Sequence, residues 1–175
     1  MKKELALHIL TTLILLIPIF LIRFLNLSNW PFFVGGLIGA ILPDIDHIIY
    51  VYYLRPYEVT SQRVMYEAKK GDLWRTWDLL SSTRSERANL ILHTVFFQIV
   101  FLLLSFLVVS SSSSLLGKGL VLAFLLHLLV DEIMDLRSTG SLANWFKNIP
   151  IQLDATQLNI YLIANFAAIC ILTLI

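Results

Sequence analysis

Long apolar runs, separated by polar connections, make up most of this chain. A helix that crosses a lipid bilayer needs about 20 predominantly apolar residues. Five segments meet this requirement, so the pattern predicts an all-α, polytopic membrane helix bundle. The predicted membrane-spanning segments are Leu5–Leu25, Phe32–Leu54, Ala88–Val109, Gly119–Leu136 and Leu158–Ile175.

The connections between these segments differ in length and character. Asn26–Pro31 is short and ends in a proline, which suits the first turn of a helix, so spans one and two should be antiparallel neighbours. The serine run Ser110–Ser114 reads as a flexible turn between spans three and four. Arg137–Gln157 is longer and offers Trp145 and Phe146 as anchors at the membrane interface.

The longest polar section, residues 55–87, separates spans two and three. Inside it, Asp72–Leu80 places its apolar side chains at helical spacing and its charged side chains elsewhere. This pattern predicts a short amphipathic helix on the membrane surface, within a basic loop. We interpret the helix as an interfacial connector, although the same position would suit a lid over a site.

Composition supports a membrane protein with a single domain, residues 1–175. Hydrophobic residues account for 58% of the chain, whereas soluble domains contain about 45–50%. The run after Lys2 and Lys3 is longer than the apolar core of a secretory signal and lacks a cleavage pattern, so we interpret it as a retained span. No basic stripe with interleaved aromatic residues is present, which argues against a nucleic-acid partner.

Positive charge is distributed unevenly between the two sides of the predicted bundle. With five spans that alternate in direction, eleven of the thirteen Lys and Arg residues fall on the side of the N-terminus. Only Arg23 and Lys118 fall on the other side. The positive-inside rule therefore places the N-terminus and both long connections in the cytoplasm, and the C-terminus outside.

Ionisable residues inside the predicted spans are also confined to one side. All four histidines fall in the cytoplasmic halves of their spans, and so do four aspartates. Charged groups at membrane depth are costly, so they indicate a functional site whose members are partners of one another. The converging residues are His8, Asp44, Asp46, His47, His93, His127, Asp131 and Asp135.

Spacing within the helices indicates which of these side chains share a face. His127, Asp131 and Asp135 are four residues apart and lie along one helix face. Asp44 and His47 are three residues apart and also share a face. Two predicted helices thus direct an imidazole and a carboxylate toward the same region.

The middle of span two has two further features. Asp46 would point elsewhere in an ideal helix, but Pro43 removes a backbone donor and favours a kink that can re-aim it. Gly35, Gly36 and Gly39 form a small-residue surface at the spacing that allows close approach of another helix.

Imidazole and carboxylate groups together favour a divalent transition metal, most often zinc, with manganese or iron as alternatives. Helical bundle cores commonly hold such sites. We predict one or two ions, and the predicted ligands are Asp44, His47, His93, His127 and Asp131. The residues expected to complete the shell or to transfer a proton are His8, Asp46 and Asp135. The alternatives are packing histidines at positions 8 and 93 and a structural His–Asp hydrogen bond between positions 127 and 131.

These residues resemble the pattern of a family of small bacterial inner-membrane proteins known as membrane-bound metal-dependent hydrolases. That family has an early histidine, a Leu-Pro-Asp-Ile-Asp-His element ending span two, a Thr-His-Ser element opening the next span, and a late His-x-x-x-Asp pair. The matching positions here are His8, Leu42–His47, His93-Thr94, and His127 with Asp131. The resemblance covers roughly Leu5 to Leu136 and implies location in the bacterial inner (cytoplasmic) membrane.

Parts of the chain depart from that family. Glu86-Arg87-Ala88-Asn89 stands where the family commonly has His-Arg-Gly, and residues 55–87 and the region after Asp135 match poorly. The mixture of His, Asp and His-x-x-x-Asp is also similar to zinc-dependent phospholipase C and related phosphodiesterases. This second resemblance implies phosphoester chemistry.

Together these features predict an integral membrane hydrolase of the phosphodiesterase or phosphatase type, which acts on a lipid or lipid-linked phosphoester at the cytoplasmic leaflet. A two-metal site can activate water and hold the oxygens of a phosphoryl group. Basic residues of the long loop, such as Arg63, Lys69, Lys70 or Arg75, would attract the headgroup. A divalent-cation transporter and a non-catalytic membrane protein stabilised by metal are the alternative functions.

Overall fold

The computed structural model describes residues 2–23 and 29–175, and this part of the chain is all-helical, without strands. The all-α prediction is therefore confirmed for the described residues. Residues 24–25 of the first predicted span and residues 26–28 of the predicted turn lie outside them.

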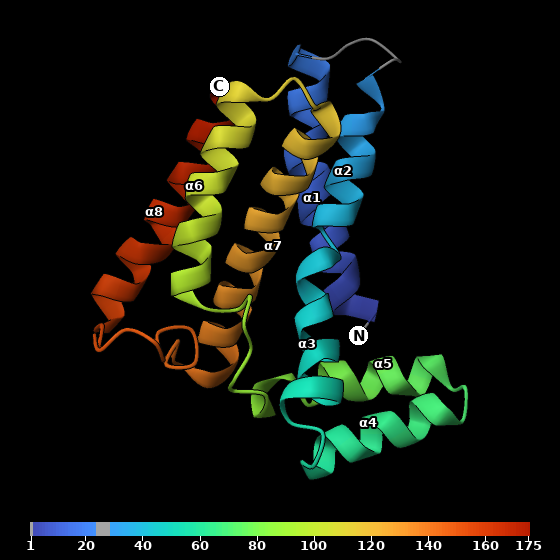
Figure 1. Ribbon diagram of the computed structural model, residues 1–175. Coiled ribbons are helices and arrows are strands. Elements are labelled where there is room, and N and C mark those ends of the chain that lie inside the picture. The colour runs from blue at the N-terminus through green and yellow to red at the C-terminus, as the bar shows by residue number, and fades with distance from the viewer. Residues whose placement is uncertain (1, 24–28) are drawn as a thin grey trace.

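The long helices run side by side, with the chain direction alternating from one to the next (Figure 1). Helix α7 (Leu115–Thr139) is central and contacts α1 (Lys2–Arg23), α2 (Pro31–Gly39), α6 (Val95–Ser111) and α8 (Ala155–Leu174). The N-terminus and the C-terminus lie at opposite ends of this bundle (Figure 1). The central position of α7 brings its polar residues within reach of every other long helix.

The rod that begins with α2 is interrupted. After α2, the chain forms a 3-10 turn, η2 (Leu42–Asp44), then α3 (Ile45–Ile49) and a π-helical turn, η3 (Tyr50–Leu54). Pro43 lies within the 3-10 turn and has no amide hydrogen to donate to the preceding turn of helix. The break predicted at Pro43 is therefore confirmed.

Glycines make the contact between α2 and α7 very close. A Cβ atom added at Gly35 or Gly39 would lie 1.9 or 2.2 Å from the carbonyl oxygen of Leu116 or Leu120 on α7. One added at Gly119 of α7 would lie 1.9 Å from a carbonyl oxygen of α2. Any side chain at these positions would force the backbones apart, so the small-residue surface predicted on span two is confirmed and its partner is α7.

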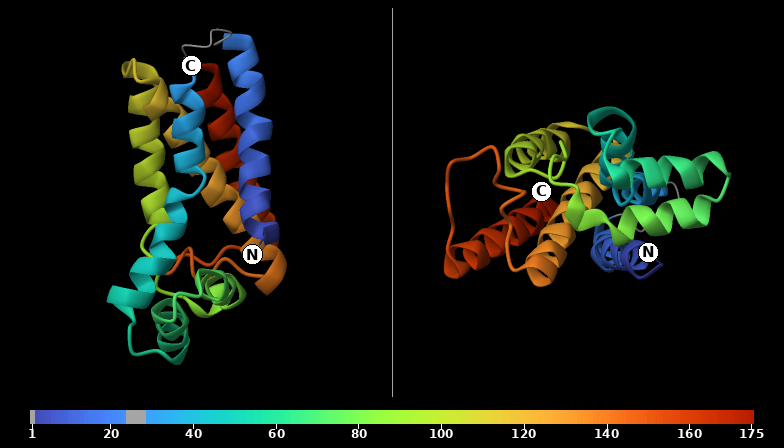
Figure 2. Two further views of the ribbon diagram at one scale, coloured as in Figure 1. Left: turned by 90° about the vertical axis from the view of Figure 1, so that its right-hand side faces the viewer. Right: turned by 90° about the horizontal axis from the view of Figure 1, so that it is seen from below.

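Two short helices, α4 (Val59–Lys69) and α5 (Leu73–Ser82), form a hairpin that lies across the N-terminal end of the bundle (Figures 1 and 2). Gly71 joins them with φ at +79°, a conformation that glycine adopts without strain. Asp72 caps α5, because its Oδ1 accepts a hydrogen bond of 2.9 Å from the Arg75 amide. The short helix predicted over Asp72–Leu80 is confirmed.

Helix α6 begins at Val95, whereas the sequence pattern placed the start of span three at Ala88. The Asp46 carboxylate accepts hydrogen bonds from the amides of residues 91–93 at distances of 3.1, 2.6 and 3.3 Å. These amides are therefore satisfied by Asp46 of α3, and the segment before α6 is non-helical, with bends at residues 91–94. Hydrophobic periodicity contains no information about such a long-range capping contact.

Trp145 is only 2% exposed, so its predicted role as an interface anchor is wrong. The connection before α8 folds back onto the end of the bundle, and Trp145 packs in a core cluster with Phe124 and Leu128 of α7. Its indole Nε1 donates a hydrogen bond of 2.8 Å to Asp135 Oδ2. A buried indole with a satisfied N–H is a structural element of this end of the fold.

Within residues 2–23 and 29–175, two helical stretches are long and apolar enough to cross a membrane, Pro31–Leu54 and Ala155–Leu174. Ala6–Ile22 and Val95–Ser111 are apolar but shorter. Helix α7 is long enough, but it carries Lys118, Asp131 and Glu132 within one membrane thickness. The structure therefore supports membrane helices, whereas the predicted set of five spans is not confirmed.

Candidate metal centre

His127 lies buried on α7, opposite the break in the second rod. Its Nδ1 is 2.7 Å from the carbonyl oxygen of Ala40, which can only accept, so Nδ1 carries the hydrogen. A continuous helix would pair this carbonyl with the Asp44 amide, but that amide bonds to the Ile41 oxygen instead. In the neutral ring, Nε2 therefore presents its lone pair, and it has no hydrogen-bond partner among the described residues.

The lone pair of His127 faces two carboxylates. Nε2 is 3.1 Å from Asp131 Oδ2 and 3.6 Å from Asp44 Oδ1. Electron-rich atoms this close repel one another unless a proton or a metal cation lies between them. His8 approaches the same carboxylate, with its Nε2 3.1 Å from Asp131 Oδ1, and its ring stacks on that of His127 at a centroid distance of 3.9 Å.

His8, His127 and Asp131 each offer one ligand atom, and these atoms lie within 4.8 Å of one another. Zinc binds imidazole nitrogen and carboxylate oxygen at about 2.0–2.2 Å, so two ligands of a tetrahedral site are about 3.4 Å apart. All three side chains are buried. The group can therefore hold a metal ion after small side-chain movements.

Asp131 is also paired with an arginine from the polar section. Arg84 Nη1 is 2.6 Å from Asp131 Oδ1, and Arg84 Nε is 3.4 Å from Asp135 Oδ1. Burial alone would lower the pKa of the Arg84 guanidinium, but attraction to Asp131, Asp135 and Asp44 outweighs burial and raises the pKa above its ordinary value. Arg84 is therefore a fixed positive charge beside the cluster.

His93 links two buried carboxylates. Its Nδ1 is 3.1 Å from Asp46 Oδ2, and its Nε2 is 2.9 Å from Asp131 Oδ2. Both ring nitrogens are therefore engaged by carboxylates in this arrangement. Asp46, which also accepts the amides of residues 91–93, is 0% exposed. His93, held by Asp46, therefore fixes the orientation of the Asp131 carboxylate, as residues next to the ligands do in metal sites.

His47 has a different environment, dominated by Arg87. The Nε of Arg87 donates a hydrogen bond of 3.1 Å to His47 Nδ1. The other two Arg87 nitrogens donate to the hydroxyl of Thr83 and to the carbonyl of Leu80. Burial, and after it the nearby Arg84 charge, lower the pKa of Arg87 to about 10, so the guanidinium remains charged at neutral pH.

A small cavity of about 40 Å³ lies beside the cluster, at the end of the bundle that α5 covers. Side chains of the bundle and of α5 share its wall, and the lining residues are His8, Asp44, His47, Ile48, Trp77, Leu80, Ser81 and Arg84. Helix α5 therefore forms part of the cavity wall, a position that suits the lid rather than the plain connector of the sequence-based interpretation. The space is enough for a few water molecules.

The structure brings all eight predicted site residues into one contact network. Those that touch Asp131 or its partners directly are His8, Asp44, His93 and His127. Asp46 joins through His93, Asp135 joins through Arg84, and His47 lies against His93 with ring centroids 5.0 Å apart. Sequence reasoning missed Arg84 and Arg87 as site residues. The available signal was their position directly before the segment that carries His93.

A second buried polar cluster lies on another face of α7, at the residue after Asp131. Glu132 is 0% exposed, and its carboxylate accepts hydrogen bonds from the Tyr161 hydroxyl at 2.5 Å and from Gln98 Nε2 at 3.2 Å. Asn165 Nδ2 is 3.5 Å away. Glu132 faces away from the Asp131 cluster, and these partners are neutral.

Comparisons with protein-family models, with curated proteins and with solved structures find no match for this chain. The arrangement of the side chains is therefore the basis on which the site is interpreted.

Proposed function

We propose that this protein is a membrane-bound, metal-dependent hydrolase that cleaves a phosphoester of a lipid or lipid-linked substrate at the cytoplasmic leaflet. The observation that carries the proposal is the His127 Nε2 lone pair, which faces Asp131 and Asp44 beside a cavity. His8, His127 and Asp131 would hold one metal ion. Three protein ligands with space next to them are typical of catalytic zinc sites, whereas structural sites are closed by four.

The proposed membrane arrangement has α1, the α2–η3 rod, α6, α7 and α8 as five spans in the bacterial inner membrane, as in the family that the motifs resemble. Its support comes from the alternating chain direction (Figure 1) and from the eleven-to-two distribution of Lys and Arg residues. Many apolar side chains of α8 face outward, for example Ile160, Ile163 and Ile171 at 61%, 67% and 59% exposure. A lipid environment would cover this surface.

The residues around the cavity would divide the chemistry between them. A bound divalent cation would supply Lewis acidity and a more acidic water. Asp44 lines the cavity and is 3.6 Å from His127 Nε2, so it is placed to take a proton from that water. Arg84 offsets negative charge at Asp131, and Trp77 and Leu80 of α5 limit entry of bulk water.

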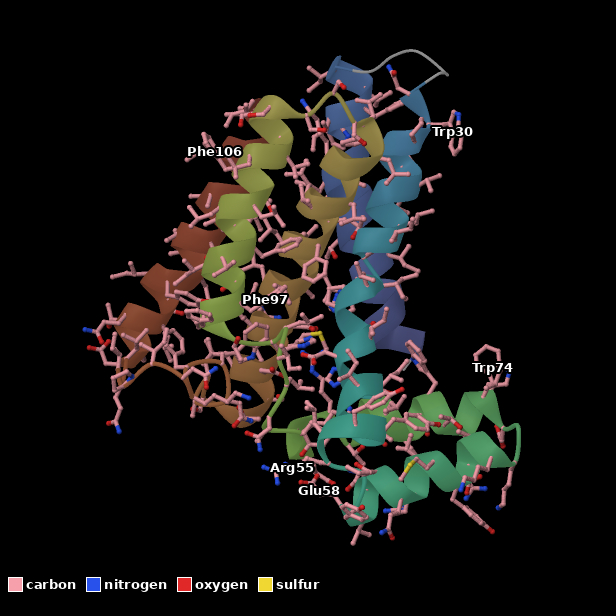
Figure 3. The ribbon with its side chains drawn as sticks, viewed as in Figure 1. Trp30, Arg55, Glu58, Trp74, Phe97 and Phe106 are labelled. Atoms are coloured by element: carbon pink, nitrogen blue, oxygen red, sulfur yellow. The ribbon has the colours of Figure 1, made fainter. Side chains whose placement is uncertain are left out.

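Helix α5 also supports a lipid substrate. Its Leu73 and Trp74 are 74% and 72% exposed and lie at the outer end of the helix, with Trp74 on the side of α5 that faces the bundle (Figure 3). A tryptophan and a leucine at that position suit the headgroup region of a membrane. A substrate held in that region would reach the cavity from the side of α5.

Metal analysis of the purified protein in detergent tests the proposal most directly. We expect about one equivalent of a divalent transition metal in the wild type and less than about a tenth of it in His127→Ala, because structural and catalytic metals depend on each ligand. Tyr161→Phe, a change in the other buried cluster, is the matched control and should keep its metal. Wild-type protein without stoichiometric metal would contradict the proposal.

Turnover separates the hydrolase from the two alternatives. We expect the metal-loaded protein to release phosphate or alcohol from a phospholipid or an isoprenyl phosphate, and His127→Ala to be inactive. A transporter would instead move the metal across proteoliposomes in an Asp131-dependent way. A metal that only ties the helices together would stabilise the fold without turnover or flux.

A further inference from the structure

The hydrogen bond between Arg87 and His47 determines which tautomer His47 adopts. Because Arg87 Nε can only donate, His47 Nδ1 must accept, and the hydrogen of the neutral ring is then on Nε2. His127 has the opposite tautomer, since its Nδ1 donates to the Ala40 carbonyl. His127 thus presents a lone pair, whereas His47 presents an N–H donor.

The His47 donor is buried and has no acceptor in the part of the chain that the structure describes. His47 is 6% exposed, and its Nε2 makes no hydrogen bond to residues 2–23 or 29–175. Arg84 Nη2 is also buried without an acceptor among these residues, whereas Arg84 Nη1 and Nε contact Asp131 and Asp135. His47 and Arg84 both line the cavity beneath α5. Buried donors without acceptors are costly unless a ligand satisfies them.

Positive charge beside His47 comes from Arg87 and Arg84, and the Asp44 carboxylate lines the same cavity. Arg87 is 3% exposed, and its three hydrogen bonds all go to neutral acceptors, namely His47, Thr83 and the Leu80 carbonyl. A buried guanidinium without a carboxylate in contact attracts negative charge. His47 accepts a hydrogen bond from Arg87 and lines the cavity, so it lies between this positive charge and a ligand in the cavity. A second metal at His47 is disfavoured, because it would have to displace Arg87 and sit near two arginines.

We propose that the cavity is a phosphate site, in which His47 Nε2–H and Arg84 Nη2–H donate to the terminal phosphoryl oxygens of a phosphomonoester substrate. The inference rests on the proposed hydrolase function and narrows its substrate to a phosphate monoester. The cavity is partly open, so a terminal phosphate can lie in it while the rest of a monoester extends outward. The metal would be held by His8, His127 and Asp131, and Arg84 contacts Asp131 and also lines the cavity.

Binding of inorganic phosphate to the full-length protein, with metal removed by a chelator, tests the donors separately from the metal. The wild type should bind phosphate, and His47→Asn should bind about ten- to hundred-fold more weakly, because asparagine keeps an acceptor for Arg87 but has no donor at the Nε2 position. His47→Gln places an amide N–H near the Nε2 position and should recover most of the binding. Equal binding by the wild type and His47→Asn would overturn the inference.

Metal content of the same variants separates this inference from the proposed function. Both His47 variants should keep the wild-type metal stoichiometry, since His47 is a donor here. If they lose the metal, His47 is a ligand and the phosphate site is wrong, while the hydrolase proposal stands. If the wild type holds no metal and hydrolyses nothing, the hydrolase proposal fails, and the phosphate titration still decides whether the donors bind an oxyanion.

Two further measurements cover the ligand source and the folding of the variants. Short-chain phosphatidic acid should compete with inorganic phosphate if a lipid phosphomonoester is the ligand, whereas short-chain phosphatidylcholine, a diester, should not. If phosphatidic acid does not compete with inorganic phosphate, a lipid phosphomonoester is excluded as the ligand and a soluble phosphomonoester is left. Equal competition by phosphatidylcholine overturns the monoester assignment. Nitrogen-15 spectra of the histidines in the wild type need no variant. They should show the hydrogen of His47 on Nε2, and this signal should shift when phosphate is added. Hydrogen on Nδ1 would overturn the assigned tautomer and the donor role of His47.

Discussion

Asp131 and Glu132 are consecutive acidic residues of α7, and both are fully buried, but their surroundings are opposite in kind. Asp131 is contacted by three imidazoles and the Arg84 guanidinium. Glu132 is contacted by the neutral Tyr161, Gln98 and Asn165 side chains. Two successive residues of α7 therefore face a crowded ionisable cluster and a neutral hydrogen-bond network.

The two clusters also differ in what they leave unsatisfied. Around Asp131, the buried polar atoms without a hydrogen-bond partner among the described residues include His8 Nδ1, Arg84 Nη2 and His127 Nε2. Around Glu132, every polar side chain finds an acceptor or donor within the cluster. A satisfied network stabilises a fold, whereas buried groups that lack partners are retained where a ligand completes them. We therefore assign chemistry to the Asp131 cluster and helix docking to the Glu132 cluster.

Substitution of the two acids gives the largest expected contrast. Asp131→Ala removes the shared partner of three histidines and leaves Arg84 without its closest anion, so we expect a loss of about 3–5 kcal/mol in the free energy of unfolding and loss of the metal. Glu132→Gln keeps an acceptor for Tyr161, so it should cost less than about 1 kcal/mol and leave the metal in place. Unfolding in detergent micelles and metal analysis measure both quantities, and equal effects at the two positions would remove the distinction between the clusters.

Arg84→Met changes the balance between arginine and metal at Asp131. Loss of its charged hydrogen bonds should lower the stability of the metal-free protein by about 1.5–3 kcal/mol. Because Arg84 occupies Asp131 Oδ1 and repels a second cation, its removal should also increase metal affinity. The rise in melting temperature on adding zinc should then be larger in Arg84→Met than in the wild type. A smaller rise would show that Arg84 supports metal binding rather than competing with it.

Sequence pattern predicted the position of the Asp131 cluster because helix period and chain alternation are strong constraints. His127 and Asp131 share a face by their spacing of four, and alternation of the helices brings His8 to the same end as both. Chain alternation also explains why His8 joins the group that can hold a metal ion, although the sequence pattern assigned it to completing the shell or to transferring a proton. Periodicity locates residues but does not rank them as ligands.

The hydrogen-bond roles of the histidines could not be predicted in this way. His127 acquires its tautomer from the Ala40 carbonyl, 87 positions away, and His47 acquires its tautomer from Arg87, 40 positions away. Arg87 and Arg84 lie in a polar section that is joined to α3 where the amides of residues 91–93 donate to Asp46. Local pattern contains no information about such contacts, so nothing in it distinguishes these two arginines from the other basic residues of the polar section.

Tyr161→Phe tests the neutral cluster at intermediate strength. The substitution removes the hydroxyl that lies 2.5 Å from Glu132 Oε1 and leaves a buried carboxylate with one donor fewer. We expect a loss of about 1–2 kcal/mol in the free energy of unfolding, with metal content and turnover per bound metal unchanged. If Tyr161→Phe lowered metal content, the two clusters would be coupled through α7, and the separation of chemistry from docking would be incorrect.

Asn165→Ala should have the smallest effect, and the reason is geometric. Its Nδ2 lies 3.4 Å from Gln98 Oε1 and 3.5 Å from Glu132 Oε2, at the limit of a hydrogen bond, so we expect a loss of about 0.5 kcal/mol or less. Combined with Tyr161→Phe, it forms a double-mutant cycle. In the Tyr161→Phe background, Asn165 is the remaining hydrogen-bond donor from α8. If Asn165 donates to Gln98 or Glu132, the coupling energy should therefore exceed about 0.5 kcal/mol. Additive losses would instead show that Tyr161 alone docks α8 onto Glu132. The contrast between the two acids would then be larger, because one neutral hydroxyl from α8 would contact Glu132, whereas three imidazoles and a guanidinium contact Asp131.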